Sequence, residues 1–363
     1  MPSLTRIATQ VVKGLPYLEK ELSRRASIKT GMVLTTPTIY YVIFSGKCNL
    51  ACTFCTIYKQ TEPTLSEEVM HRVIREAKDL SKRGFNMSLS GGEPTIYKPL
   101  YSSLELAQEL GVNFGFTTNG LTLTKGNVER ILRYDPFNIN VSLESVDTNV
   151  NEGLRPMKEG TRRTLEGIDN LLAEKARVGS RVSVIVKPTI MEQNYRGLPA
   201  LVRHFGRDAK VQINFQPFVG KNGDPHWVKD MNSLKDVLDE LKELQEQGYP
   251  IIGGTHMFEQ FFDYLTNPPD QDSLRHMDLH GEKRNCDIGL RAMGIFPNGD
   301  VHFCDFLNQP VGNVYHQSLS EIYYGDLANK QRGQMVHCNI DCQQTCKRPT
   351  PLLAKARSFI RMG

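Results

Sequence analysis

The chain has 363 residues, 39% of them hydrophobic, and its 44 basic and 40 acidic residues give a net charge of +4. A chain of this length can bury a sizeable core, and so balanced a charge gives no electrostatic case for binding nucleic acid. No run approaches the roughly 18 apolar residues of a membrane span, and no signal-peptide run opens the sequence, so we expect a soluble, cytoplasmic protein.

Residues 1–36 are predicted to form an amphipathic N-terminal extension. A helix here would carry leucines along one side and cations around them: Leu15, Leu18, Leu22, Lys13, Lys20, Arg24 and Arg25. Residues 351–363 show a similar basic amphipathic pattern. Such helices usually pack on their own domain, and the alternative is peripheral contact with an anionic membrane.

From residue 37 onwards, strand-like and helix-like runs alternate. The strands are predicted over 39–44, 85–90, 112–118, 137–143, 182–187 and 211–217. The helices are predicted over 66–80, 100–110, 128–132, 165–172, 198–205 and 234–244. Such alternation implies parallel strands joined by crossover helices. The pattern therefore predicts an α/β fold, a partial (β/α)6 TIM-like barrel over residues 37–225, with a connecting helical segment over 226–280.

Polar and apolar residues alternate within these strands. In 137–143 and 211–217, asparagine, serine and glutamine separate the large apolar residues. If the apolar faces pack on the outer helices, the polar faces line the lumen, which would then hold something polar. The alternative is an open sheet with one solvated face. Candidates for lining a substrate site are Asn140, Lys187, Asn214 and Gln216, followed by His256 and Asp305.

Cys48, Cys52 and Cys55 follow the first strand at CxxxCxxC spacing. Thiolates favour iron–sulfur clusters, and a four-iron cluster ordinarily takes four of them, so three close thiolates leave one iron open. A zinc site is the alternative, but zinc motifs usually pair cysteines as CxxC and fill all four positions. A disulfide is less favoured, because 8 cysteines are few for a chain of 363 residues.

Short polar motifs follow the next strands. Ser90-Gly-Gly-Glu-Pro94 combines two glycines, which let the backbone approach a ligand closely, with a carboxylate that can accept from an ammonium group. Thr117-Thr-Asn-Gly120 ends the third strand, and Val141-Ser-Leu-Glu-Ser145 ends the fourth, with Arg155 in the loop beyond it. Each motif alone also suits an ordinary turn or a solvated loop.

In this order, the cysteine loop and the motifs resemble the radical S-adenosylmethionine (SAM) superfamily. The resemblance implies that the three cysteines bind a 4Fe-4S cluster whose open iron takes SAM. It also implies that Glu93 binds the methionine amine of SAM and that Arg155 binds its carboxylate. The other SAM-binding residues that it implies are Phe54 beside the adenine, Gly91, Gly92, Thr118, Asn119, and Ser142 and Glu144 facing the ribose. Relatives commonly have aspartate at the position of Glu144.

A second cysteine group lies further along the chain. Cys286 and Cys304 flank two strand-like runs joined by an Asn-Gly turn at Gly299, which predicts a hairpin that brings both sulfurs to one end. Three more cysteines follow at CxxxCxxxC spacing: Cys338, Cys342 and Cys346. On a helix this spacing places the sulfurs on one face. A structural zinc site is the alternative for this group.

Together with the Gly312–Ile322 stretch, the second group resembles the SPASM or twitch module of radical SAM enzymes, here over residues 281–350. The resemblance implies one auxiliary 4Fe-4S cluster, because five cysteines are too few for two. The expected ligands, with Cys338 as the spare cysteine, are Cys286, Cys304, Cys342 and Cys346. A full SPASM module usually offers more cysteines and CxxC pairs, so this chain departs from the fuller pattern.

The resemblance predicts a radical SAM enzyme that cleaves SAM reductively to a 5′-deoxyadenosyl radical. The radical would abstract hydrogen from a polar small molecule in an oxidation, epimerisation or rearrangement, with electrons from a low-potential donor such as flavodoxin or ferredoxin. The alternatives are maturation of a ribosomally made peptide, modification of a lipid or isoprenoid, and a non-catalytic iron–sulfur electron carrier or redox sensor. The residues before the first strand are too few for the separate peptide-recognition domain that many peptide-modifying relatives carry there.

Overall fold

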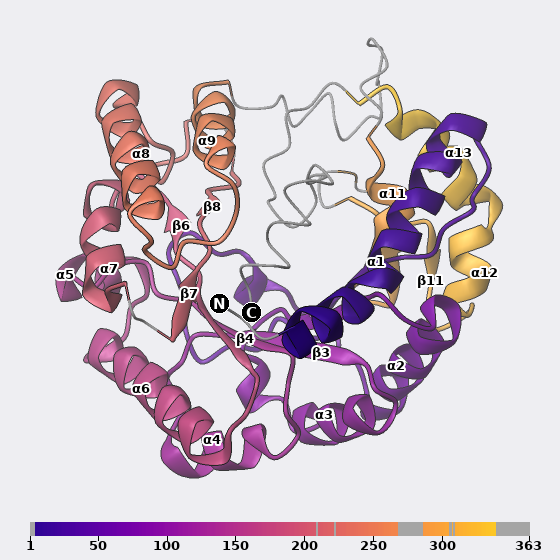
Figure 1. Cartoon of the computed structure of the whole chain (residues 1–363), viewed down its shortest axis with the longest axis horizontal. Helices are drawn as coiled ribbons and strands as arrows, with labels where there is room; N and C mark the ends of the chain where they lie inside the picture. Colours follow the sequence, from indigo (N-terminus) through magenta and orange to yellow (C-terminus); the bar gives the residue numbers. More distant parts are fainter. Residues whose placement is uncertain are drawn as a thin grey trace.

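The structure is a computed structural model that describes residues 4–207, 210–220, 223–267, 286–304, 307 and 309–338, with side chains described from residue 15 onwards. At its centre lies a nine-stranded sheet in the order β11-β10-β9-β1-β2-β3-β4-β5-β7, and helices surround the strands (Figure 1). A second sheet pairs β6 with β8. The strands are β1 Ile39–Ile43, β2 Asn86–Ser90, β3 Asn113–Thr118, β4 Asn138–Val141, β5 Ser183–Val186, β6 Thr189–Ile190, β7 Val211–Ile213, β8 Gln216–Pro217, β9 Ala292–Ile295, β10 Asp300–His302 and β11 Gly312–Asn313.

The predicted α/β partial barrel is confirmed. Strands β1, β2, β3, β4, β5 and β7 pair in parallel, in their predicted order. Burial alternates along β1, β2, β4, β5 and β7: in β4, Ile139 and Val141 are buried, whereas Asn138 and Asn140 are half-buried. The buried residues face the surrounding helices, and the half-buried residues face the lumen. The lumen side is polar in β2 and β4, as the alternation predicted, whereas β1 places Ile39, Tyr41 and Ile43 there.

The helices form where apolar residues recur at helical spacing behind a capping group. At the start of α2, Ser66 Oγ accepts a hydrogen bond from Val69 N (3.2 Å), and Met70 and Val73 are buried. The helices are α1 Leu4–Thr30, α2 Glu67–Ser81, α3 Leu100–Glu109, α4 Lys125–Leu132, α5 Thr148–Leu154, α6 Gly160–Val178, α7 Leu198–Phe205, α8 Met231–Glu246, α9 His256–Thr266, α11 Ile288–Arg291, α12 Leu319–Tyr324 and α13 Asp326–Met335, with short 3-10 turns at Ile57–Lys59, Pro94–Ile96 and Tyr195–Gly197.

The cysteine-rich module continues the barrel sheet. β9 pairs in parallel with β1, with Ala292 opposite Ile39, and pairs antiparallel with β10. The hairpin predicted around Gly299 is therefore present, and the φ of Gly299 is +85°. Cys286 precedes β9 and Cys304 follows β10, so both lie toward the end of the sheet at which β1 begins. The sequence did not predict that the hairpin would join the sheet.

The segment over 226–280 was predicted as a helical connection, and its described part also extends the barrel. Ile251 forms a parallel bridge with Ile213, beside β7, and α8 and α9 pack against each other. One cluster of buried residues runs through the barrel, this segment and the module, and includes Tyr40, Phe261 and Phe303. Residues 351–363 lie outside the described residues.

The N-terminal extension forms helix α1, as predicted, and α1 crosses the end of the barrel at which β2 and β3 begin (Figure 1). Tyr17 Oη donates to Asn86 Oδ1 (2.8 Å), and Asn113 Nδ2 donates to Tyr17 Oη (3.1 Å). These asparagines are the first residues of β2 and β3. Within the described residues, no helix is both long enough and apolar enough to span a membrane.

Candidate active site

A cavity of about 150 Å³ lies where strands β1 to β4 end. Ligands of parallel α/β barrels bind at this end, because the loops after the strands converge there. Cys48, Cys52 and Cys55 line the cavity. So do eight of the nine residues predicted to bind SAM: Phe54, Gly91, Gly92, Glu93, Thr118, Asn119, Ser142 and Arg155. The structure thus brings the cysteine loop and the motifs together, and their individual contacts with SAM stay predictions.

The three cysteines lie on the loop between β1 and α2. Burial raises the pKa of the Cys52 thiol to about 11, although the Arg155 guanidinium acts in the opposite direction. Burial also raises the pKa of Cys48. Iron binding must therefore displace protons from these thiols, and Arg155 favours the thiolate form. Three thiols and one guanidinium around a shared cavity suit a cluster with three protein ligands.

Gly91 and Gly92 bring the end of β2 into backbone contact with the cysteine loop. Gly92 N donates to Ser45 O (2.8 Å), and Glu93 N donates to Lys47 O (3.0 Å). A Cβ atom built on Gly92 would lie 1.8 Å from the Lys47 carbonyl oxygen, and Gly91 has a φ of +119°. Glycine is required at both positions, since only a backbone without side chains fits this contact.

The Glu93 side chain is 1% exposed and surrounded by donors. Its Oε1 accepts from Thr95 N (3.1 Å), Thr95 Oγ1 (2.6 Å) and Thr118 Oγ1 (2.7 Å), whereas Oε2 accepts only from Asn119 N (2.7 Å) among the described hydrogen bonds. Burial raises the pKa of Glu93, and the hydrogen bonds oppose this shift. Oε2 therefore keeps acceptor capacity for an ammonium group in the cavity.

We expect Glu93→Gln to weaken SAM binding by about 10- to 100-fold, because an amide cannot neutralise the methionine ammonium. The cluster should stay bound, since Glu93 is not one of its ligands. The measurement is a SAM titration followed by the electron paramagnetic resonance (EPR) spectrum of the reduced cluster. Glu67→Gln, at an exposed acid on α2, is the matched control. Unchanged SAM affinity in Glu93→Gln would contradict the assignment.

Arg155 lies at the end of α5, where the sequence suggested a short loop. Its Nε and Nη2 donate to Glu144 Oε1 (3.0 and 2.6 Å). Its Nη1 lies 3.7 Å from Cys52 Sγ, and its guanidinium carbon lies 5.3 Å from the centre of the Phe54 ring. Arg155 thus offers its charge at the cavity wall, between the cysteine loop and a fixed carboxylate.

Glu144 does not line the cavity, contrary to its predicted place beside the ribose of SAM. It is fully buried, its Oε1 binds Arg155, and its Oε2 accepts from Thr189 N (2.6 Å). The geometry makes Glu144 a positioning residue for Arg155. In a strand, every second side chain points to the same face, so Ser142 and Glu144 would both face the cavity. β4 ends at Val141, so this alternation does not extend to Glu144.

Sequence reasoning missed a hydrogen-bonded chain behind the cysteine loop. Thr53 Oγ1 and His226 Nε2 are 2.9 Å apart, and His226 Nδ1 lies 2.8 Å from Asp224 Oδ1. The Thr53 backbone N also donates to Leu154 O (3.0 Å), immediately before Arg155. Asp224 and His226 lie in a Gly- and Pro-containing stretch that reads as a loop, and no pattern links it to Thr53. These hydrogen bonds connect the cysteine loop to the loop that holds Asp224 and His226.

Four of the predicted substrate residues lie after or within the lumen strands. Asn140 Nδ2 donates to Thr117 Oγ1 (3.2 Å), and Thr117 lines the cavity. Lys187, Asn214 and Gln216 are half-buried at the ends of β5 and β7 and in β8. His256 is exposed at the first position of α9 and does not line the cavity. Asp305 lies outside the described residues.

Three of the five later cysteines are described. The Cys286 thiol hydrogen-bonds the Cys338 side chain, and this bond and burial raise the pKa of Cys286. Cys304 packs against the same core as Cys286. The contact places the Cys338 side chain beside Cys286, and the choice of Cys338 as the spare cysteine stays a prediction. Cys342 and Cys346 lie outside the described residues, so the complete ligand set stays a prediction.

Two family models match the sequence. The radical SAM superfamily model matches residues 42–193, and the SPASM model, an iron–sulfur cluster-binding domain, matches residues 286–348. The first range contains the three-cysteine loop and every cavity residue through Arg155. The second range begins at Cys286 and contains all five later cysteines.

The chain is also similar to individual proteins of known name. Fe-coproporphyrin III synthase of Methanosarcina barkeri is 26% identical over 83% of this chain and 78% of its own length. Mycofactocin maturase MftC of Mycolicibacterium smegmatis is 24% identical over 71% of this chain and 62% of its own length, so the chain spans about three fifths of that relative. Streptococcus suis SuiB bound to SAM has the same fold, with a TM-score of 0.65 and 21% identity over 92% of this chain and 80% of that chain, and SuiB has also been solved bound to its precursor peptide SuiA.

These matches decide between the alternatives left open by the cysteine spacing. Both cysteine groups fall inside models of iron–sulfur proteins, which favours clusters over zinc or disulfides. The relatives are enzymes, which sets aside a non-catalytic electron carrier. The chain belongs to the radical SAM superfamily, as an enzyme that uses a 4Fe-4S cluster and S-adenosylmethionine and carries a SPASM iron–sulfur module after its barrel.

Proposed function

We propose that this enzyme abstracts a hydrogen atom from a peptide held in the barrel lumen. With its cluster and SAM bound, and with an electron from a low-potential donor, reductive cleavage of SAM supplies the 5′-deoxyadenosyl radical for this step. Glu93 and Arg155 would bind the amine and carboxylate of SAM, and Phe54 would pack beside its adenine. Holding SAM at both ends beside the lumen supplies the alignment that hydrogen transfer needs.

The chemistry of the lumen supports a peptide substrate. Four residues lie side by side across strands β3, β4, β5 and β7: Thr117, Asn140, Ile185 and Gln212. Amide side chains each offer a donor and an acceptor, which complements the peptide backbone. The described half-buried positions of β1 to β5 and β7 hold no charged residue, and Lys187 follows directly after β5. SuiB, bound to a precursor peptide, and the maturase MftC add support from related proteins.

A polar small molecule is the second candidate. Fe-coproporphyrin III synthase aligns over a larger share of both chains than the maturase does. A small acidic substrate would require several cations in the lumen, because isolated carboxylates are costly to bury. Within the described lumen, Lys187 supplies a single cation at the end of a strand. The amide-rich surface therefore favours the peptide.

The auxiliary cysteines lie far from the SAM site along the sheet. Cys286 and Cys304 lie near the start of β1, whereas the SAM-site cysteines follow its end. β1 alone separates these ends by about 13 Å, since each residue of a strand advances about 3.3 Å. This separation supports electron transfer or a structural role for the auxiliary cluster, with the substrate placed in the lumen between the two sites.

We expect anaerobically reconstituted enzyme, reduced with dithionite, to release 5′-deoxyadenosine from SAM. The combined Cys48→Ala, Cys52→Ala and Cys55→Ala variant should release none and should keep about four irons on its auxiliary site. Chromatography with mass detection and iron determination measure both results. No 5′-deoxyadenosine from the wild-type enzyme under strict anaerobiosis would contradict the radical reaction.

The substrate class is tested by co-expressing the enzyme with short peptides encoded beside its gene. We expect one peptide to change mass with the wild-type enzyme and to stay unchanged with the triple cysteine variant. The same peptide should stimulate 5′-deoxyadenosine formation in vitro. Unchanged peptides, together with stimulation by a polar small molecule, would favour the second candidate.

A further inference from the structure

Helix α1 packs on the protein through its charged side and leaves its leucines exposed. Lys20, Glu21 and Arg24 on the inner side are each at most 9% exposed. The leucines on the outer side are 44% to 56% exposed: Leu15, Leu18 and Leu22. A surface helix ordinarily buries its apolar stripe and exposes its charges, so α1 is inverted.

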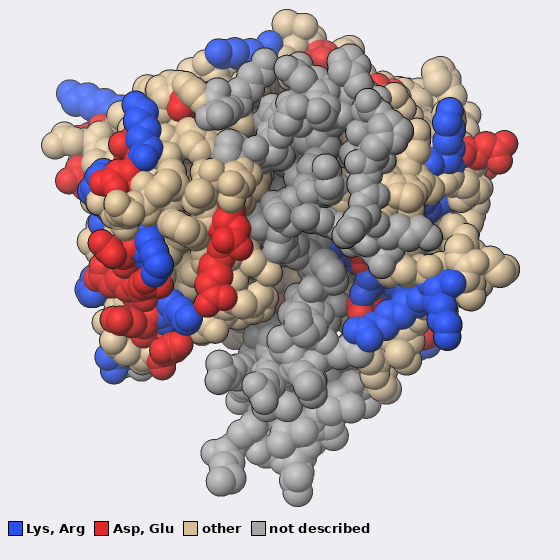
Figure 2. Space-filling model, turned by 90° about the horizontal axis from the view of Figure 1, so that it is seen from above, with Lys and Arg blue, Asp and Glu red and all other residues tan. Residues whose placement is uncertain are grey.

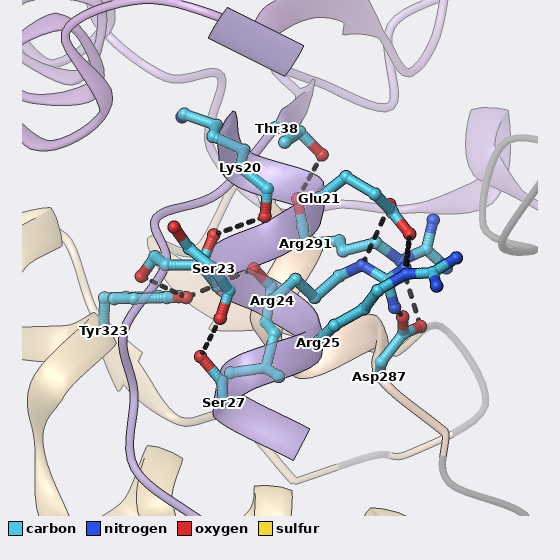
Figure 3. A network of polar contacts seen from close by, with 12 residues as sticks. Lys20, Glu21, Ser23, Arg24, Arg25, Ser27, Thr38, Asp287, Arg291 and Tyr323 are labelled. Atoms are coloured by element: carbon cyan, nitrogen blue, oxygen red, sulfur yellow. Dashed lines mark hydrogen bonds and ion pairs between the residues drawn. The ribbon is translucent and has the colours of Figure 1, made fainter. Parts of the chain in front are cut away.

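A buried network of charges holds α1 in this orientation (Figure 3). Arg24 forms ion pairs with Glu21 and with Asp287, which precedes α11. Arg291 Nε donates to Asp287 Oδ1 (3.0 Å). The side chains of these four residues are all less than 10% exposed. Turning the leucines inward would break the buried pair between Arg24 and Asp287 and leave Asp287 with Arg291 alone, so the fold itself keeps the leucines outside.

We call the three outward leucines, Leu15, Leu18 and Leu22, the α1 apolar face. The described part of the chain exposes 13 large hydrophobic side chains, and six of them lie between residues 15 and 34. The other three, Ile28, Met32 and Leu34, lie at the end of α1 and just after it. Such a concentration on one short segment marks an interaction surface, whereas single exposed apolar residues do not.

Cations outnumber acids beside the α1 apolar face. Arg83 reaches α1, because its Nη2 lies 3.2 Å from Glu19 Oε2. Among the described side chains of α1 and residues 82 and 83, the exposed charged residues are Glu19, Arg25, Lys29, Lys82 and Arg83, four cations and one acid. Figure 2 shows basic side chains with a few acidic ones on the right, whereas acidic side chains are more numerous on the left.

We infer that the α1 apolar face docks on an anionic lipid surface, which makes the protein a peripheral membrane enzyme. An exposed apolar stripe with flanking cations is the pattern of helices that lie in the membrane interface. A second copy of the chain would bring the same cations face to face, so self-association is disfavoured. α1 crosses the barrel end opposite the cavity, so a docked molecule keeps its active site open to the other side. The inference does not rest on the proposed substrate.

The test uses the full chain, reconstituted with its clusters, in flotation with lipid vesicles. We expect binding to vesicles of phosphatidylcholine with about 30 mol % phosphatidylglycerol, and weak binding to pure phosphatidylcholine. The combined Leu15→Gln, Leu18→Gln and Leu22→Gln variant should lower the partition coefficient at least about 100-fold, because three leucines lose their burial in lipid. Reversing the charges of Arg25 and Lys29 to glutamate should weaken binding about 10-fold or more, and salt should do the same.

Leu327→Gln is the matched control, because Leu327 is 61% exposed but lies on α13 and is not one of the α1 leucines. This variant should bind vesicles as the wild type does. Iron content and thermal unfolding midpoints show that each variant is folded. Wild-type protein that binds neither kind of vesicle would overturn the inference. A dimer in light scattering that the triple leucine variant abolishes would also overturn it, in favour of a second copy.

Discussion

Gly92→Ala is expected to remove most SAM cleavage, although it adds a single methyl group. The new Cβ would lie 1.8 Å from the Lys47 carbonyl oxygen and 3.1 Å from Cys48 N, so the cysteine loop would have to move by more than about 1 Å. Because a misplacement of about 1 Å in an active site can cost about 100-fold in rate, we expect at least that loss. The measurement is 5′-deoxyadenosine formation, together with the iron bound at the SAM site.

Gly126→Ala is the matched control for this prediction. Gly126 lies in α4, and a Cβ built there meets no atom within 4 Å. Alanine at an open helical position stabilises a protein by about 0.4 to 1 kcal/mol, so this variant should keep its iron and its activity. Full activity in Gly92→Ala would show that the cysteine loop tolerates the shift, and it would contradict the tight contact between the two motifs.

Arg24→Met is expected to lower the free energy of unfolding by about 3 kcal/mol and to empty the auxiliary site. Arg24 binds both Glu21 and Asp287, and Arg291 is the other buried cation of this group. Removing Arg24 leaves two buried carboxylates with a single buried guanidinium, so one negative charge is uncompensated. Asp287 is next to Cys286, so the loosened segment carries an auxiliary ligand. We expect about four irons to remain, all at the SAM site, as shown by iron determination and EPR spectroscopy.

Arg25→Met tests whether burial of the ion pair explains the losses expected for Arg24→Met. Arg25 contacts the same Glu21 carboxylate (3.0 Å), but its side chain is 53% exposed. Exposed pairs contribute less than about 1 kcal/mol, so the Arg25 variant should keep its stability and both clusters. Equal losses in the two variants would mean that the helix as a whole matters, rather than the buried pair with Asp287.

The cavity could be predicted almost completely because its residues lie at the ends of successive parallel strands. Such ends meet at one edge of the sheet, so short motifs after β1, β2, β3 and β4 converge without any knowledge of the helices between them. Each motif is also local: two glycines permit a close approach, and thiolates at fixed spacing supply the ligands. The alternation within the strands likewise predicted which residues face the lumen.

Other features depended on contacts between distant segments, and no local pattern could predict them. Glu144 turns from the cavity to Arg155 and Thr189, because β4 ends before it. His226 reaches Thr53 from the opposite wall of the barrel.

The sequence by itself determined the strand order, the cysteine loop and the motifs around it, because spacing and periodicity act over a few residues. The tertiary structure decided that the hairpin of the module would join β1, and that α1 would bury its charges and expose its leucines. An amphipathic pattern shows that the two sides of a helix differ. Which side faces inward depends on the residue of another segment that the helix packs against. For α1 that is Asp287, an acid from a distant segment that only the folded chain brings within reach of Arg24.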